Sequence, residues 1–61
     1  MDDKQHVLDA YGERIQQLFK VFFEAYTSAQ GNTSEEANAE QRFKAGMAHA
    51  RHVRDRALAL L

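Results

Sequence analysis

The sequence of 61 residues predicts an all-α fold, an antiparallel hairpin of two long helices, and three observations support it. Proline is absent and glycine occurs only three times, so little in the composition would interrupt a helix. Apolar residues recur at alternating intervals of three and four residues in two segments, the heptad pattern of helices that pack side by side. A short polar segment separates the two. We therefore expect a single helical-hairpin domain over residues 1–61.

The two heptad patterns define one apolar seam on each expected helix. The first seam comprises Leu8, Tyr11, Ile15, Leu18, Phe22, Ala25 and Ala29. The second comprises Ala39, Phe43, Gly46, Ala50, Val53, Ala57 and Leu60. These seams predict helices over about residues 3–30 and 34–61, joined by a turn over residues 31–33.

The turn contains residues that end one helix and begin the next. Gly31 suits the left-handed conformation that commonly follows a helix. Thr33 and Glu36 have the spacing of a capping box, so we expect Thr33 to cap the second helix and Glu36 to return to its amide.

A short turn makes the two helices antiparallel neighbours, and residues equally far from it should face each other. The facing residues then have numbers that add up to about 64. This register places Leu18 over Gly46, Phe22 against Phe43, and Tyr11 against Val53. Large side chains on the first helix mostly face small ones on the second, as a closely packed seam requires.

Beside the seams, the heptad frame places further large apolar residues on one side of the hairpin, here named the apolar flank. It consists of Phe19, Tyr26, Met47 and Leu61, with Phe23 and Leu58 at its edge. The opposite side is mostly polar, with Arg14, Glu35, Arg42, His49 and Arg56 among Val7 and Val21. An apolar surface of this size on a small protein usually marks an interface. We expect a homodimer, an antiparallel four-helix bundle; the alternatives are a different helical partner or a parent protein from which the hairpin was cut. The residues expected at the self-association interface are Gly12, Phe19, Phe23, Tyr26, Met47, Leu58 and Leu61.

The apolar flank has an internal symmetry. Gly12 and Tyr26 lie seven residues on either side of Phe19, and Glu40 and Arg54 lie seven on either side of Met47. A two-fold axis near Phe19, perpendicular to the helices, would set Phe19 against its copy and Tyr26 over Gly12 of the other subunit. The competing arrangement, with the axis along the helices, packs the first helix on the partner's second.

The second half of the second helix is basic and supports an alternative function. Lys44, Arg51, Arg54 and Arg56 could contact phosphates in a small RNA- or DNA-binding hairpin dimer. Acidic residues on the same helix and a net charge of −1 argue against nucleic acid as a partner.

No pattern in the sequence indicates an enzyme, a cofactor or a metal site. His49 and His52 are three residues apart on one helix, but a firm metal site needs a third ligand and usually a fourth. The hydroxyl residues cluster at the turn, where capping explains them. We therefore predict a small non-enzymatic protein-interaction or regulatory module.

The sequence also predicts a cytoplasmic protein. It contains no apolar stretch of the length needed for a membrane span, and Met1 is followed by Asp2 and Asp3 rather than by a basic segment.

Overall fold

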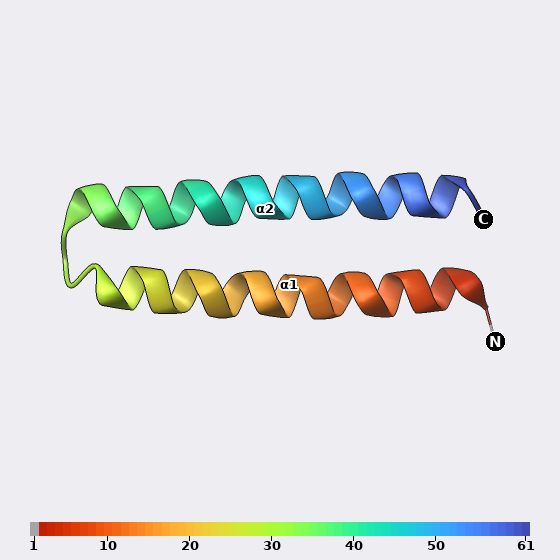
Figure 1. The fold of residues 1–61 in the computed structure, drawn as a ribbon, viewed down its shortest axis with the longest axis horizontal. Coiled ribbons are helices and arrows are strands. Elements are labelled where there is room, and N and C mark those ends of the chain that lie inside the picture. The colour runs from red at the N-terminus through yellow and green to blue at the C-terminus, as the bar shows by residue number, and fades with distance from the viewer. Residues whose placement is uncertain (1) are drawn as a thin grey trace.

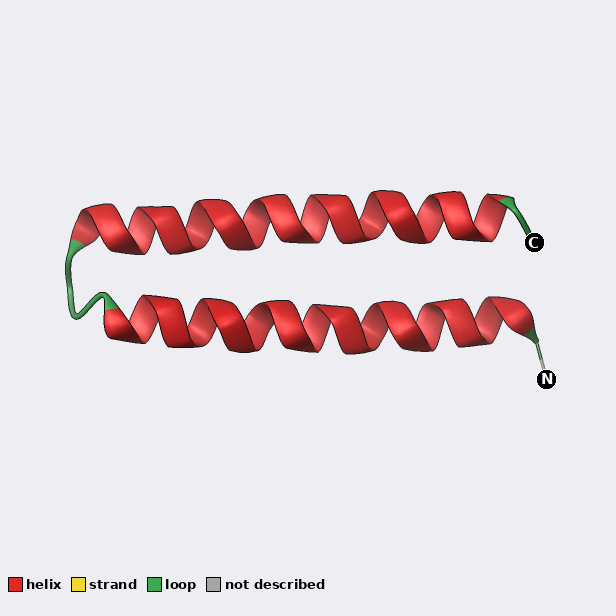
Figure 2. Cartoon of the chain, in the orientation of Figure 1, coloured by secondary structure: helices red, strands yellow, loops and turns green. Residues whose placement is uncertain are grey.

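The computed structural model describes residues 2–61 and confirms the helical hairpin (Figure 1). Helix α1 spans Asp3–Ser28 and helix α2 spans Thr33–Ala59. The two helices lie side by side in one layer of 45 × 17 × 6 Å, and both termini emerge at the same end (Figure 1). Apart from the turn and the chain ends, the described residues are helical (Figure 2). One hairpin therefore has two broad faces that no second layer covers.

Helix α1 ends at Ser28, two residues before the expected boundary. The cause is the backbone of the turn, because both Gln30, at φ 51°, and Gly31, at φ 81°, adopt the left-handed conformation. The amide of Asn32 then donates a hydrogen bond of 2.9 Å to the carbonyl of Ala29, which closes the turn. The prediction for Gly31 is confirmed, whereas the left-handed Gln30 was not expected.

The prediction that Thr33 caps the second helix is wrong. Thr33 is already helical, and the N-cap is Asn32, whose Oδ1 accepts a hydrogen bond of 3.1 Å from the Glu35 amide. Asparagine is at least as good an N-cap as threonine, and Asn32 has the extended backbone that a cap requires. Moving the cap by one residue also places Glu36 one position too far along the helix for a capping box.

The predicted register is confirmed near the middle of the hairpin and on the side of the turn. A Cβ atom added to Gly46 would lie 2.7 Å from Cδ2 of Leu18, so the leucine occupies the space that the glycine leaves open. The rings of Phe22 and Phe43 have centroids 4.8 Å apart. These two contacts join α1 and α2 in the predicted register.

At the open end the predicted seam fails in two positions. Val53 was expected to pack against Tyr11 but is 50% exposed, and the guanidinium of Arg54 lies over the Tyr11 ring instead, 4.6 Å from its centroid. Leu60 lies at the C-cap and is exposed. In a straight α-helix, positions seven residues apart are offset by about 20° around the axis. Along α2 this offset turns Val53 away from α1 and brings the following residue, Arg54, toward the seam.

Few side chains are fully shielded from solvent. Among residues 2–61, only Ala29 and Ala39 are buried, and both are small. The large seam residues on both helices are half-buried: Leu8, Tyr11, Ile15, Leu18, Phe22 and Phe43. The described hairpin therefore has a seam but no sealed core, which leaves little hydrophobic burial to stabilise it alone.

Candidate functional site

The apolar flank carries an exposed aromatic cluster on α1. Phe19 is 52% exposed and Phe23 is 58% exposed, and their ring centroids are 6.1 Å apart. Tyr26 extends the cluster toward the turn and is also exposed, with its ring 5.5 Å from the half-buried Phe22. Met47 lies level with Leu18 in the confirmed register and is half-buried. These side chains place a large apolar surface beside the seam, in contact with solvent.

The rest of the flank is separated from this cluster along the hairpin. In the register of the two helices, Leu58 lies level with the first turns of α1, about 18 Å along the axis from Phe19. Leu61, which is exposed, lies further toward the open end. Between the two groups Arg54 binds the Asp55 carboxylate, with Nη2 2.9 Å from Oδ1. The apolar flank thus consists of a central aromatic part and a smaller leucine part.

Gly12 lies between the aromatic part and the leucine part of the apolar flank, at a position with free space beside the backbone. A Cβ atom added at this position would meet no atom within 4 Å, in contrast to the crowded Gly46. Packing within the hairpin therefore does not require a glycine there. The open space above Gly12 is available to a side chain from another molecule.

The four basic residues proposed for nucleic-acid contact do not share one face of α2. Lys44 and Arg51 are exposed and share one side of α2, because they are seven residues apart. Met47 of the apolar flank lies three residues after Lys44, so this is the side of the flank. Arg54 is engaged by Asp55 and Tyr11. Arg56 lies on the opposite side, where Arg42 and His49 precede it at seven-residue intervals. Arg56 therefore lies apart from the other three basic residues, which follow one another on the side of α2 that carries the apolar flank.

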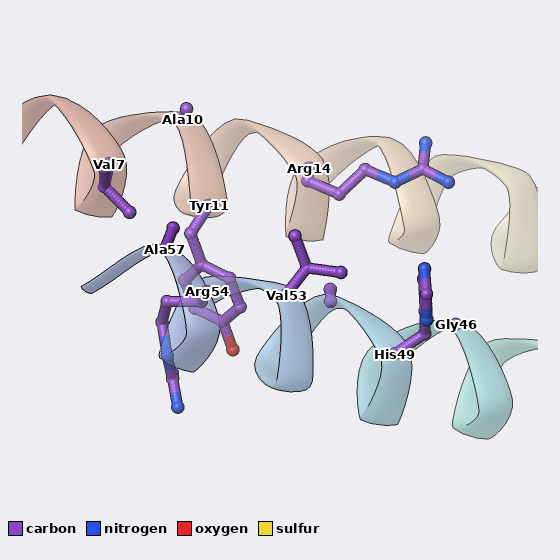
Figure 3. Close-up of a pocket in the computed structure, with 10 residues that line it drawn as sticks. Val7, Ala10, Tyr11, Arg14, Gly46, His49, Val53, Arg54 and Ala57 are labelled. Atoms are coloured by element: carbon purple, nitrogen blue, oxygen red, sulfur yellow. The ribbon is translucent and has the colours of Figure 1, made fainter. Parts of the chain in front are cut away.

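A groove of about 500 Å³ runs between the helices on the side opposite the apolar flank (Figure 3). Val7 and Tyr11 reach down from α1, and Val53 reaches up from α2 between them and His49 (Figure 3). The lining is mostly apolar or small and comprises Val7, Ala10, Tyr11, Arg14, Gly46, His49, Ala50, Val53, Arg54 and Ala57.

Two nitrogen-bearing side chains mark one end of this groove. The imidazole of His49 points from α2 toward α1, and the Arg14 side chain extends along α1 to the same end (Figure 3). Arg14 Nη1 donates one hydrogen bond of 3.2 Å to Oε1 of Gln17, and both residues are exposed. The described lining contains no acidic residue. The groove therefore combines an apolar floor with hydrogen-bond donors and positive charge.

Sequence reasoning treated this side as a polar surface and missed the groove. The available signal was the small size of Ala50 and Ala57 along α2, together with Ala10 on α1. Small residues on facing helices leave the space between them unfilled wherever no large side chain crosses it. The exposed position of Val53, which makes one wall of the groove, arises from the rotation of α2 at the open end.

His49 and His52 both lie at exposed positions of α2. Within the described part of the chain, no group of three or more histidine, cysteine, aspartate or glutamate residues is placed to hold a metal ion. Neither described helix combines the length and the apolar character that crossing a bilayer requires.

In comparisons with known proteins, no family model matches the chain, and no curated protein or solved structure shows significant similarity to it. The surfaces of the hairpin are therefore the features that bear on its function.

Proposed function

We propose that this chain is a non-enzymatic protein-interaction module that works as a homodimer, with the apolar flank as the interface of a four-helix bundle. The observation that carries the proposal is the exposed aromatic cluster of Phe19, Phe23 and Tyr26 on a hairpin that has no sealed core in its described residues. Burying such a cluster against a second copy would supply the hydrophobic contribution that one hairpin lacks.

The accessible surface supports an interface of ordinary size. The chain exposes 4876 Å², whereas a compact monomer of 7.0 kDa exposes about 4,000 Å². The excess of about 800 Å² is close to the area that each partner buries in a standard protein–protein interface. A second copy seated on the apolar flank would therefore bring the exposed area per chain to that of a compact protein.

The space above Gly12 favours the arrangement with the two-fold axis perpendicular to the helices. In that dimer Phe19 lies against its copy, and Tyr26 of one subunit enters the space above Gly12 of the other. Charge is a weaker argument for this arrangement, because Arg54, which would meet Glu40 of the other subunit, already has Asp55 as a partner.

The solution mass tests the dimer directly. We expect light scattering to give twice the 7.0 kDa mass of the chain, and a variant with Phe19→Ser and Phe23→Ser to be monomeric. Val21→Ser is the matched control, because Val21 is 65% exposed on α1 but lies outside the apolar flank. A monomeric wild-type chain would rule out the homodimer.

Two further variants test the geometry of the dimer. Gly12→Leu has room within one hairpin and removes a helix-weakening glycine, so we expect it to dissociate the dimer while preserving the helices. Glu13→Leu adds the same side chain on the solvent face and should leave the dimer intact. Phe19→Cys should form a disulfide between subunits rapidly under oxidation, and a proven dimer without it would exclude the perpendicular axis.

Gel-shift measurements at two salt concentrations separate this proposal from nucleic-acid binding. Binding through phosphate contacts would weaken steeply as salt increases. We expect no shift of RNA or DNA at either concentration, since Arg56 lies on the opposite side of α2 from Lys44 and Arg51, Arg54 is paired with Asp55, and the chain has a net charge of −1. The cytoplasmic location and a regulatory role remain predictions from the sequence.

A further inference from the structure

We infer that the groove opposite the apolar flank is a docking site for an acidic amphipathic helix of a partner protein. This inference goes beyond self-association and does not depend on it, because every residue lining the groove belongs to a single hairpin. A dimer formed through the apolar flank would leave the groove on its outer surface.

The shape of the groove suits a helix. It is open along one side and lies between two antiparallel helices, the position that a third helix takes in a bundle. The lining extends from Gly46 to Ala57 on α2, about 16 Å along the axis, or about three helical turns. Ala50 and Ala57 have small side chains, so a partner helix could approach the backbone of α2 closely there.

The lining predicts the apolar side of the partner. Val53 is half-exposed within the groove, and Val7 faces the same space from α1 (Figure 3). A partner helix with leucine or a similar residue at heptad spacing would cover both valines and contact the alanines between them. The area removed from water would be the main favourable contribution to binding.

The charges of this side predict the polar residues of the partner. Arg14 carries a fixed positive charge, and His49 offers an imidazole N–H at the same end of the groove. Arg42 and Arg56 continue the face on α2 that contains His49, and the acidic residue of that face, Glu35, lies two heptads from His49 toward the turn. Glutamate or aspartate beside the apolar stripe of the partner would complement these groups and orient its helix.

The same observations disfavour a nucleic acid in this groove. A phosphate backbone binds through charge and hydrogen bonding, and most of the lining side chains offer neither. An acidic amphipathic helix uses both the apolar floor and the cationic end.

The experiment measures the binding of three fluorescent peptides to the full chain by anisotropy. The first probe is a capped peptide of about 18 residues, with leucine at heptad positions a and d, glutamate at e and g, and alanine elsewhere. The second replaces glutamate with lysine, and the third replaces leucine with alanine. We expect the first to bind at least about tenfold more tightly than either of the others. Equal binding of all three would overturn the inference.

Paired variants of the protein locate the binding site. Val53→Ser and Arg14→Gln should each weaken binding of the first peptide by about threefold or more. Val21→Ser and Lys20→Gln change exposed residues of the same types outside the groove and should leave the affinity unchanged. All four substitutions are at solvent-accessible positions, and circular dichroism would verify that each variant is folded. Equal effects of the groove variants and their controls would contradict the inference.

Two measurements separate this site from the other surfaces. The variant with Phe19→Ser and Phe23→Ser should bind the first peptide as the wild type does, so the inference can stand even if the homodimer fails. Loss of peptide binding in that variant would place the peptide on the apolar flank and overturn the inference. A labelled RNA duplex that binds more tightly than the peptide, and that requires Arg14, would also overturn it.

Discussion

Leu18 occupies the space above Gly46, where an added Cβ atom would lie 2.7 Å from Cδ2 of the leucine. This contact joins the two helices near the middle of the hairpin and, together with Phe22 against Phe43, defines their register. It also explains the glycine, which weakens an isolated helix by up to about 1 kcal/mol relative to alanine. The packing of Leu18 from α1 against Gly46 offsets this weakening of α2.

The first prediction concerns this contact. Gly46→Leu should lower the free energy of unfolding by about 1–3 kcal/mol, because two leucines cannot fit in one layer of the seam. Adding Leu18→Ala to the same chain should restore part of the loss by returning the volume. Urea unfolding of both variants measures this, with Ala48→Leu on the solvent face of α2 as the control. A Gly46→Leu variant as stable as the wild type would show that the register is different.

The second prediction concerns the cap of α2. Asn32→Ala removes the acceptor of the Glu35 amide and should lower the free energy of unfolding by about 1 kcal/mol. Thr33→Ala should change stability by less than about 0.5 kcal/mol, since Thr33 lies inside the helix and its hydroxyl caps nothing. Thermal unfolding of the two variants compares them directly. A larger effect at Thr33 would restore the cap expected from the sequence.

The third prediction concerns the two left-handed residues of the turn. Gln30→Gly should raise the free energy of unfolding by about 1 kcal/mol, because glycine adopts a φ of 51° without the steric cost of a Cβ atom. Gly31→Ala should lower it by a similar amount for the opposite reason. Chemical denaturation of the pair checks the signs, and effects of equal sign would contradict the described turn.

The fourth prediction concerns Arg54 and Tyr11. The guanidinium lies 4.6 Å from the ring centroid, so a double-mutant cycle of Arg54→Gln and Tyr11→Leu should give a coupling energy of about 0.5–1 kcal/mol. The same cycle with Arg51 in place of Arg54 should give none, because Arg51 is exposed and it is the guanidinium of Arg54 that lies over the ring. No coupling at Arg54 would indicate that Val53 covers the ring instead.

The sequence predicted the hairpin and its central register because both depend on strong patterns. The heptad spacing marks the packed side of each helix, and the volumes of Leu18 and Gly46 identify which residues face each other. The N-cap was misassigned because Asn32 and Thr33 are adjacent and chemically similar caps, so only the backbone geometry separates them. The heptad spacing and the side-chain volumes both reflect contacts within the hairpin, so the sequence of one chain is enough to identify them.

The candidate surfaces were harder to predict than the fold. Exposure of Phe19 and Phe23 follows from the heptad frame, which places both outside the seam. The groove does not follow from the heptad frame. It depends on the orientation of α2 at the open end, where Arg54 and not Val53 lies over Tyr11. A seven-residue pattern assumes that the helices coil around each other, and straight helices depart from it progressively with distance from the turn.

The antiparallel register also has a consequence for the order in which the chain folds. The segment that must be closed to join Tyr11 to Arg54 is about twice as long as the one that joins Phe22 to Phe43, and doubling a loop adds about 0.6 kcal/mol of closure entropy. The aromatic pair near the turn therefore forms at the lower entropic cost, and each later contact extends an existing pairing. We expect a zipper-like transition state in which the turn and Phe22 with Phe43 are ordered while the open end is still unfolded. Substitutions at the open end should then accelerate unfolding and leave the folding rate nearly unchanged.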